Sequence, residues 1–291
     1  MCRNRRMLRR VQLTAAVVAI AAAVAAAEPT PTVPPDVTLA ADGRFAEAYA
    51  ALAARGAERQ PEDLQALARA LLVRGMDSPD SFERWAALRA ARTAPDPALV
   101  APALRQLTGD GRYEQALALE ILAASAPEAS RGAFVTSLDS PHRTVRLRAV
   151  RALRAAEANR DELIPRFAAL ATDDPDPDVR VAAVRTLRDW RAVAAMAEIR
   201  RAVSDRSPGV CREAVVTLVG FGDPLLSSVI RERLATAPAE QRAQVLRLAG
   251  LVPAHSLLPT VGPFLSDGDP EVRAAAAAAV LGIAAGEVAL P

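Results

Sequence analysis

The chain has 291 residues, 51% of them hydrophobic, so it is long enough to bury one large core or a row of small ones. Aromatic residues make up only 3%, so the core must be built mainly from alanine, leucine and valine. Alanine and leucine favour helices, and no segment shows the strict alternation of a half-buried strand. We therefore expect an all-α protein. All 36 basic residues are arginine, and the formal net charge is +2.

The N-terminal segment 1–27 has the three-part pattern of a secretory signal peptide. Five arginines precede an apolar run at residues 11–26, and Ala25, Ala26 and Ala27 then provide the small residues that a signal peptidase accepts. The run is shorter than the ~20 apolar residues of a typical membrane-spanning helix. We expect cleavage near Ala27 and a location in the bacterial periplasm or outside the cell. The alternative is an inner-membrane anchor at residues 11–27; no later segment has the length and apolar character to span a bilayer.

Cleavage would lower the net charge from +2 to −3, because five arginines and no acidic residue leave with the leader. This balance argues against a nucleic-acid partner. Cys211 would be the only remaining cysteine, so the mature chain would have no intrachain disulfide.

Four prolines between residues 29 and 35 indicate an extended linker after the leader. Residues 42–54 and 61–73 then have the pattern of helices, which we interpret as an N-terminal cap. Residues 271–285 are rich in alanine and predict a final helix that caps the C-terminal end.

A pattern of about 31 residues recurs between these ends. Each copy has a turn rich in Asp, Ser, Pro or Gly, then an apolar anchor often followed by Arg, and then small or aliphatic residues four, five and eight positions after the anchor. The anchors recur at nearly constant spacing, and they are Phe82, Tyr113, Val145, Val179, Val210, Gln241 and Val272. The longest interval lies between Val145 and Val179, and the copies at Phe82, Tyr113 and Gln241 are the weaker ones.

Positions 0, +4, +5 and +8 of each copy form one apolar stripe on a helix, because a helix turns ~100° per residue. The Asp, Ser and Pro before the anchor cap and start that helix, and a second helix precedes the turn. A single helix pair cannot bury both of its faces, so the pairs must stack. We predict an α-solenoid, a right-handed superhelix of about seven antiparallel helix pairs. The predicted segments are a signal peptide (1–27), a Pro-rich linker (28–37), capping helices (38–76), the solenoid (77–285) and a tail (286–291).

The repeated motif is similar to that of HEAT repeats, in the short variety known as bilin-lyase HEAT-like repeats. The likeness is best at DPDPDVR (residues 174–180) and DGDPEVR (residues 267–273), and it covers roughly residues 77–285. In that family the first Asp and the Arg form a ladder between units, a role that the resemblance assigns to Asp174, Arg180, Asp267 and Arg273. Cys211 replaces the Arg in one unit, which puts the ladder there in doubt. The resemblance implies a scaffold rather than a particular function.

The sequence contains no recognisable catalytic, cofactor or metal motif. Its two histidines, His142 and His255, lie in predicted turns, and no zinc-ligand spacing occurs. The acidic run at residues 173–178 suits either helix initiation, which we favour, or Ca²⁺ binding, but it lacks the EF-hand pattern. Cys211 is either a reactive thiol near a helix start or, as we favour, a small buried residue. We therefore predict no enzyme activity, no cofactor and no metal.

Arginines recur on the solvent side of the helices that follow the turns. They are Arg148, Arg151, Arg154, Arg185, Arg188 and Arg247. In HEAT-like stacks these helices line the concave surface, so the arginines form a candidate basic stripe suited to carboxylates or phosphates. The alternative is an ordinary solvated face that nearby acids neutralise.

We predict an exported scaffold that binds another protein through its concave helix face, and the arginines favour an acidic partner. Two alternatives stay open: an accessory subunit of an enzyme, as in lyase-like HEAT relatives, and a binder of an anionic envelope polymer. Neither the identity of the partner nor the oligomeric state follows from the sequence.

Overall fold

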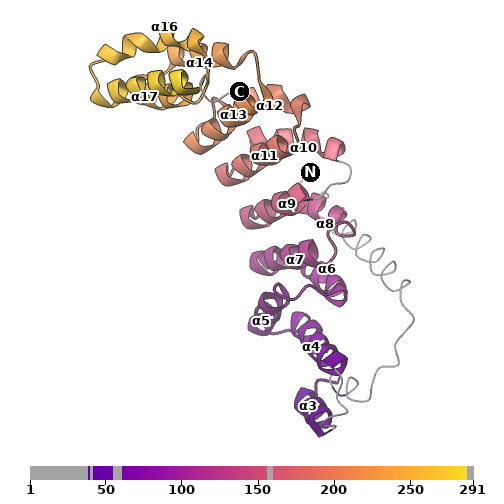
Figure 1. Ribbon diagram of the computed structural model, residues 1–291. Helices are drawn as coiled ribbons and strands as arrows, with labels where there is room; N and C mark the ends of the chain where they lie inside the picture. Colours follow the sequence, from indigo (N-terminus) through magenta and orange to yellow (C-terminus); the bar gives the residue numbers. More distant parts are fainter. Residues whose placement is uncertain (1–38, 40–41, 55–60, 156–159, 287–291) are drawn as a thin grey trace, which may run out of the picture. The chain divides into compact units, whose positions relative to one another are not determined.

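The computed structural model describes residue 39 and residues 42–54, 61–155 and 160–286. The predicted leader and Pro-rich linker lie outside the described residues. Within them the chain forms α-helices and short 3-10 helices and contains no strand, which confirms the all-α fold. The chain divides into two compact units, Met1–Ala156 and Glu157–Pro291, each built from stacked helix pairs (Figure 1). The predicted α-solenoid architecture is confirmed.

The described residues of the first unit form three helix pairs, with α3 before them. Its elements are α3 (Phe45–Ala54), α4 (Pro61–Met76) with α5 (Ser81–Ala91), η2 (Pro97–Leu99) and α6 (Val100–Gln106) with α7 (Arg112–Ser125), and α8 (Arg131–Ser137) with α9 (Arg143–Ala155). We call α5, α7, α9 and their counterparts the second helices, because each follows the turn of its pair. The second helices α5, α7 and α9 pack side by side (Figure 1). Helix α3 packs on α4, with Ala48 and Leu52 buried between them.

The described part of the second unit, residues 160–286, contains four pairs. They are α10 (Arg160–Asp173) with α11 (Pro177–Asp189), η3 (Val193–Ala195) and α12 (Met196–Ala202) with α13 (Pro208–Phe221), α14 (Leu226–Thr236) with α15 (Ala239–Ala249), and η4 (His255–Leu257), α16 (Leu258–Val261) and η5 (Gly262–Ser266) with α17 (Pro270–Gly286). The second helices α11, α13, α15 and α17 pack in that order. Among the described residues, no helix combines the length and apolar character needed to cross a membrane.

Helix α11 shows why the repeated motif folds in this way. Asp176 caps its start by accepting a hydrogen bond from the backbone N–H of Asp178 (3.0 Å), and Pro177 occupies the first turn, where no N–H is needed. The predicted stripe of Val179, Ala183, Val184 and Leu187 is fully buried. The periodicity of the sequence therefore identified the core-facing side of this helix correctly.

The first two anchors were assigned one residue too early. Phe82 and Tyr113 are 71% and 57% exposed, and the buried stripes are Ala87, Leu88 and Ala91 in α5 and Ala118, Leu119 and Leu122 in α7. These stripes place the true anchors at Glu83 and Glu114. With this correction all the intervals between successive anchors become equal, except the longer one between Val145 and Val179. The aromatic side chains misled the assignment because hydrophobicity suggested burial, whereas the position in the helix leaves them on the surface.

Candidate functional site

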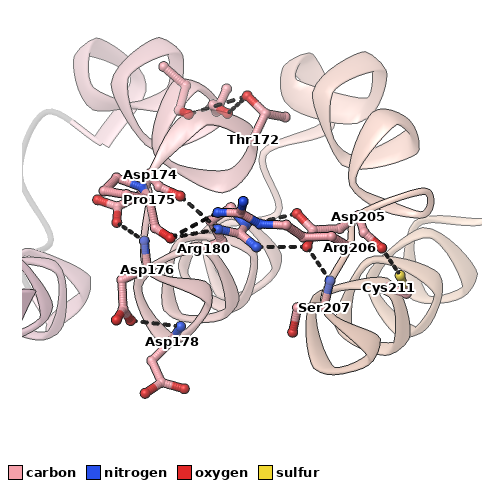
Figure 2. A network of polar contacts seen from close by, with 12 residues as sticks. Thr172, Asp174, Pro175, Asp176, Asp178, Arg180, Asp205, Arg206, Ser207 and Cys211 are labelled. Carbon is pink, nitrogen blue, oxygen red and sulfur yellow. Dashed lines mark hydrogen bonds and ion pairs between the residues drawn. The ribbon is translucent and has the colours of Figure 1, made fainter.

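The turns before the second helices α5, α7, α9, α11, α13 and α17 are each braced by a side chain of that helix. Arg180 is the best example: its Nη1 donates to the carbonyl oxygens of Asp174 (2.7 Å) and Pro175 (3.4 Å) (Figure 2). Its Nε and Nη2 donate to both carboxylate oxygens of Asp205, each at 2.8 Å, in the next helix pair. A planar guanidinium can do both because its donors point in different directions. Arg180 is 2% exposed, so both sets of bonds lie in the interior.

The same brace recurs through both units. In each case a side chain contacts the carbonyl oxygen six residues before it: Arg84 to Ser78, Arg146 to Ser140 and Arg273 to Asp267 by Nη1, Gln115 to Gly109 by Nε2, and Cys211 to Asp205 by Sγ. Gln115 and Cys211 therefore occupy the position of the arginine and keep its local contact. They cannot make the second, outward set of bonds to a carboxylate.

The predicted ladder residues lie in these turns. The side chain of Asp174 accepts a hydrogen bond from the backbone N–H of Asp176 (2.9 Å), while its carbonyl oxygen receives Arg180. Asp267 accepts from the N–H of Asp269 (2.9 Å), and its other carboxylate oxygen lies 3.9 Å from Nη1 of Arg242 in the preceding pair. The acidic residues in these turns thus act as caps and inter-pair contacts, and among the described residues no cluster of His, Cys, Asp or Glu is arranged to hold a metal ion.

Cys211 has the environment of a structural residue. It is fully buried, its Sγ lies 2.9 Å from the carbonyl oxygen of Asp205, and Gln244 Nε2 lies 3.7 Å from the same sulfur. Burial raises the pKa of the Cys211 thiol, and the nearby Arg233 opposes this shift only in part. A raised pKa lowers the thiolate population that a nucleophile or redox thiol requires.

The predicted arginine stripe in the second unit lies on the solvent side of the second helices, where it meets acidic residues. Arg185 donates by Nε to Glu213 Oε2 at 2.8 Å, and Nη1 of Arg188 pairs with Glu213 Oε1. Glu213 is only 11% exposed, whereas Arg185 is 50% exposed. Further along, Arg247 pairs with Glu271 at 2.6 Å in a contact that is open to solvent on both sides. Two arginines thus share one recessed carboxylate, and Arg188 also lies 3.8 Å from Asp189, so two acidic residues balance the two arginines here.

The first unit repeats this arrangement on α5, α7 and α9. Glu120 receives Arg148 Nε at 2.8 Å and Arg92 Nη1 at 3.3 Å. Arg154 is exposed and has an interaction partner. Arg151 is exposed, and among the described residues its side chain has no ion-pair or hydrogen-bond partner. The predicted arginines therefore form small clusters interleaved with glutamates rather than one uninterrupted basic stripe.

An exposed group of aromatic and arginine side chains on α5 and α7 was missed by the sequence analysis. It comprises Phe82, Trp85, Arg89, Arg112 and Tyr113, and we call it the aromatic cluster. Phe82 and Trp85 have ring centroids 6.0 Å apart, Arg89 lies 5.1 Å from the Trp85 ring, and Arg112 lies 4.7 Å from the Tyr113 ring. Phe82 and Tyr113 occupy the same position in adjacent pairs. The overlooked signal of this exposure is the Glu that follows Phe82 and Tyr113. When this Glu is taken as the anchor, Arg84 and Gln115 align with the other bracing residues.

The stacked helix pairs and their braced turns define an α-solenoid of short repeats. Residues 164–249 match the family model for HEAT repeats, which confirms the resemblance that the repeated motif predicted. No curated protein matches the chain.

Several solved structures are similar to the chain. The complex of CpcE and CpcF of phycocyanin lyase from Nostoc sp. PCC7120 matches with a TM-score of 0.44 and 15% identity, over 77% of this chain and 89% of that chain. An engineered protein matches with a TM-score of 0.40 and 20% identity, over 88% of this chain and 79% of that chain. YibA of Escherichia coli matches with a TM-score of 0.39 and 16% identity, over 73% of this chain and 91% of that chain.

Proposed function

We propose that this protein is an exported HEAT-repeat scaffold that holds another protein against the face of its second helices. The observation that carries the proposal is the aromatic cluster on α5 and α7. Trp, Tyr and Arg are the residues that most often dominate the energy of protein interfaces, because they combine a large apolar area with a polar group. Exposed rings cost stability in water, and a partner that covers them would remove that cost.

The charges of the second helices favour an acidic surface on that partner. Glu120 is shared by Arg92 and Arg148, so this site has one positive charge in excess. Arg151 adds a further exposed guanidinium. Carboxylates of a partner would meet planar donors that are already held in place by the recessed glutamates. Such contacts affect the association rate and its salt dependence more than the final affinity.

The test is to express the full chain with a C-terminal tag in its native envelope, crosslink it and identify the proteins that co-purify. One variant combines Phe82→Ala, Trp85→Ala and Tyr113→Ala, and its matched control is Tyr49→Ala, which truncates an aromatic residue on α3 that is 56% exposed. We expect a defined partner to be lost in the triple variant, with helicity and melting unchanged, and kept in the control. A partner that binds both variants equally would contradict the role of the aromatic cluster.

A second pair of variants tests the acidic partner. Arg151→Glu reverses a charge without breaking an ion pair among the described residues, and Arg231→Glu on α14 is the matched control on a first helix. We expect Arg151→Glu to weaken partner binding and to reduce its salt dependence, because an attractive contact becomes repulsive. If an anionic polysaccharide co-purifies and no protein does, the polymer-binding alternative replaces the protein scaffold.

A further inference from the structure

In the second unit, a bracing arginine also joins its helix pair to the next one. It does so through Nε and Nη2 of its guanidinium, which we call the outer edge of the arginine. In Arg180, Nη1 braces the turn of its own pair, while Nε and Nη2 hold Asp205 of the following pair at 2.8 Å (Figure 2). Asp205 stays oriented because it also accepts the backbone N–H of Ser207 at 2.7 Å. Two pairs further on, at the equivalent positions, Nη1 of Arg242 lies 3.9 Å from a carboxylate oxygen of Asp267, a longer ion-pair contact. An arginine that faces forward is therefore matched by an aspartate five positions before the next anchor.

The side chain of Arg273 on α17 is oriented for the same contact with a carboxylate. Its Nη1 donates to the carbonyl oxygens of Asp267 (2.8 Å) and Gly268 (2.9 Å), which is the inward brace seen in Arg180. Arg273 is exposed, and its Nε and Nη2 have no acceptor among the described residues. The side chain is thus already held in the orientation that the ladder contact needs, so binding a carboxylate would cost little conformational entropy.

The face of α17 beside Arg273 resembles an interface between pairs rather than a solvated end. Ala274 and Ala277 are exposed, although their equivalents in α15, Ala243 and Leu246, are buried in the stack that includes α17. Leu281 on the same helix is 71% exposed, and Leu265 in η5 is 47% exposed. Terminal repeats of solenoids usually carry polar residues on their outer face. Here small and apolar residues leave room for another helix to approach closely.

We infer that this face of α17 binds a helix pair of another protein, which presents an aspartate in its turn to the outer edge of Arg273. The charge and shape of the occupant follow from Asp205 and α13, which make this contact with Arg180 and α11. A second copy stacked head to tail would leave the outer edge of Arg273 without its carboxylate, because its first pair has Ser78 at the position of the aspartate. The site uses none of the residues of the aromatic cluster, so it goes beyond the proposed function.

The probe is the chain's own helix pair, added to the full protein. A second copy of residues 192–222, which contains η3, α12, α13 and Asp205, follows Gly286 through a flexible linker of about ten residues, which gives an effective concentration in the millimolar range. Amide hydrogen exchange of the added segment measures docking. We expect protection that falls about tenfold or more in Arg273→Gln, and equally in Asp205→Asn made only in the added copy. The double variant should be no worse than either single change, because both remove the same contact.

Two further variants make the outcome decisive. Leu281→Glu should abolish protection of the added segment, although it leaves the brace of Arg273 intact. Arg212→Gln in the added copy changes an exposed arginine and should have no effect on protection. An added segment that exchanges freely in every variant, or stays protected in Arg273→Gln and Leu281→Glu, would overturn the inference. Sedimentation of the unmodified chain tests the other occupant: a dimer that dissociates in Leu281→Glu would show that a second copy covers this face and would also overturn it.

Discussion

At the scale of single residues, Arg200 and Asp223 form an ion pair with two hydrogen bonds outside the braces. Arg200 on α12 donates to both carboxylate oxygens of Asp223 at 2.8 and 2.7 Å, and Leu225 N–H adds a bond of 3.2 Å. The Asp223 side chain is fully buried, and Gly222 just before it adopts a left-handed conformation (φ 66°) that ends α13. The bond from Arg200 is the main reason why the pKa of Asp223 lies below its ordinary value, against the opposing effect of burial.

This lowered pKa predicts a specific loss of stability in acid. A carboxylate with a lower pKa in the folded state stabilises the fold above its unfolded pKa, and the contribution disappears as the pH falls through the folded pKa. We expect Asp223→Asn to lower the free energy of unfolding by about 2 kcal/mol at pH 7. The difference from the wild type should shrink below about pH 4, where the carboxyl of the unfolded chain begins to take up its proton, and disappear as the pH falls through the lower pKa of the folded state.

Urea unfolding at pH 7 and near pH 3 measures this effect. The matched control is Glu232→Gln on α14, because Glu232 is exposed and should change stability little at either pH. An equal loss of stability for Asp223→Asn at both pH values would show that the shape of the Asp223 side chain stabilises the fold, and not its charge.

Some contacts of single residues could be predicted from the sequence, and others could not. The resemblance to HEAT-like repeats assigned Arg180 and Arg273 to a ladder, and both side chains bond to the turns before their helices. The contact of Arg185 and Arg188 with Glu213 was not foreseen. It joins residues 28 and 25 positions apart, and it depends on the offset between two stacked helices, which no local pattern contains.

At the scale of elements, the closest approach between helices is set by glycine. A Cβ atom on Gly282 of α17 would lie 2.3 Å from the carbonyl oxygen of Gly250, and one on Gly250 would lie 2.9 Å from the Cα atom of Ala279. Both obstacles are backbone atoms, so neither can move aside as a flexible side chain would. The contact of α15 with α17 therefore requires glycine at these positions.

We expect Gly282→Ala to destabilise the protein by about 1–3 kcal/mol, because the two helices must separate to admit one methyl group. The matched control is Gly220→Ala in α13, where an added Cβ would meet nothing within 4 Å. Alanine favours helix over glycine, so the control should gain up to about 1 kcal/mol. Thermal and urea unfolding of the two variants measure this contrast, and the same sign of change in both would contradict the close approach.

The elements themselves follow largely from local sequence. Turns such as residues 174–177 and 267–270 combine caps and proline, and the helices after them begin where the sequence predicts. The error at Phe82 and Tyr113 has a clear physical cause. Hydrophobicity alone cannot separate a buried aromatic residue from an exposed one, whereas the small and aliphatic stripe after Glu83 and Glu114 can.

At the scale of the whole molecule, one irregular spacing separates two regular arrays. Successive corrected anchors are evenly spaced except between Val145 and Val179, where the interval is longer. The boundary between the compact units, Ala156 and Glu157, falls inside that longer interval. Repeats of constant length stack in a constant register, so an insertion of this kind marks a natural division of a solenoid.

Export is the prediction that concerns the whole chain. If residues 1–27 are a signal peptide, the protein purified from the envelope should begin at Glu28, and its mass should be lower by that of the leader. Intact-mass analysis and N-terminal sequencing measure this, and Ala27→Arg should block cleavage because the enzyme requires a small residue there. A protein of full length in the membrane fraction would instead support the anchor at residues 11–27.

The sequence by itself determined the helical fold, the regular repeat of the helix pairs and the capped turns between the two helices of a pair. These features depend on contacts within one helix pair, and local periodicity and capping chemistry encode such contacts directly. Only the tertiary structure decided which glutamate lies between which arginines, that Phe82 and Tyr113 are exposed, and that the outer edge of Arg273 meets no acceptor in the described part of the chain. Those features depend on how consecutive pairs are offset when they stack, and that offset is the sum of many side-chain contacts across the interface.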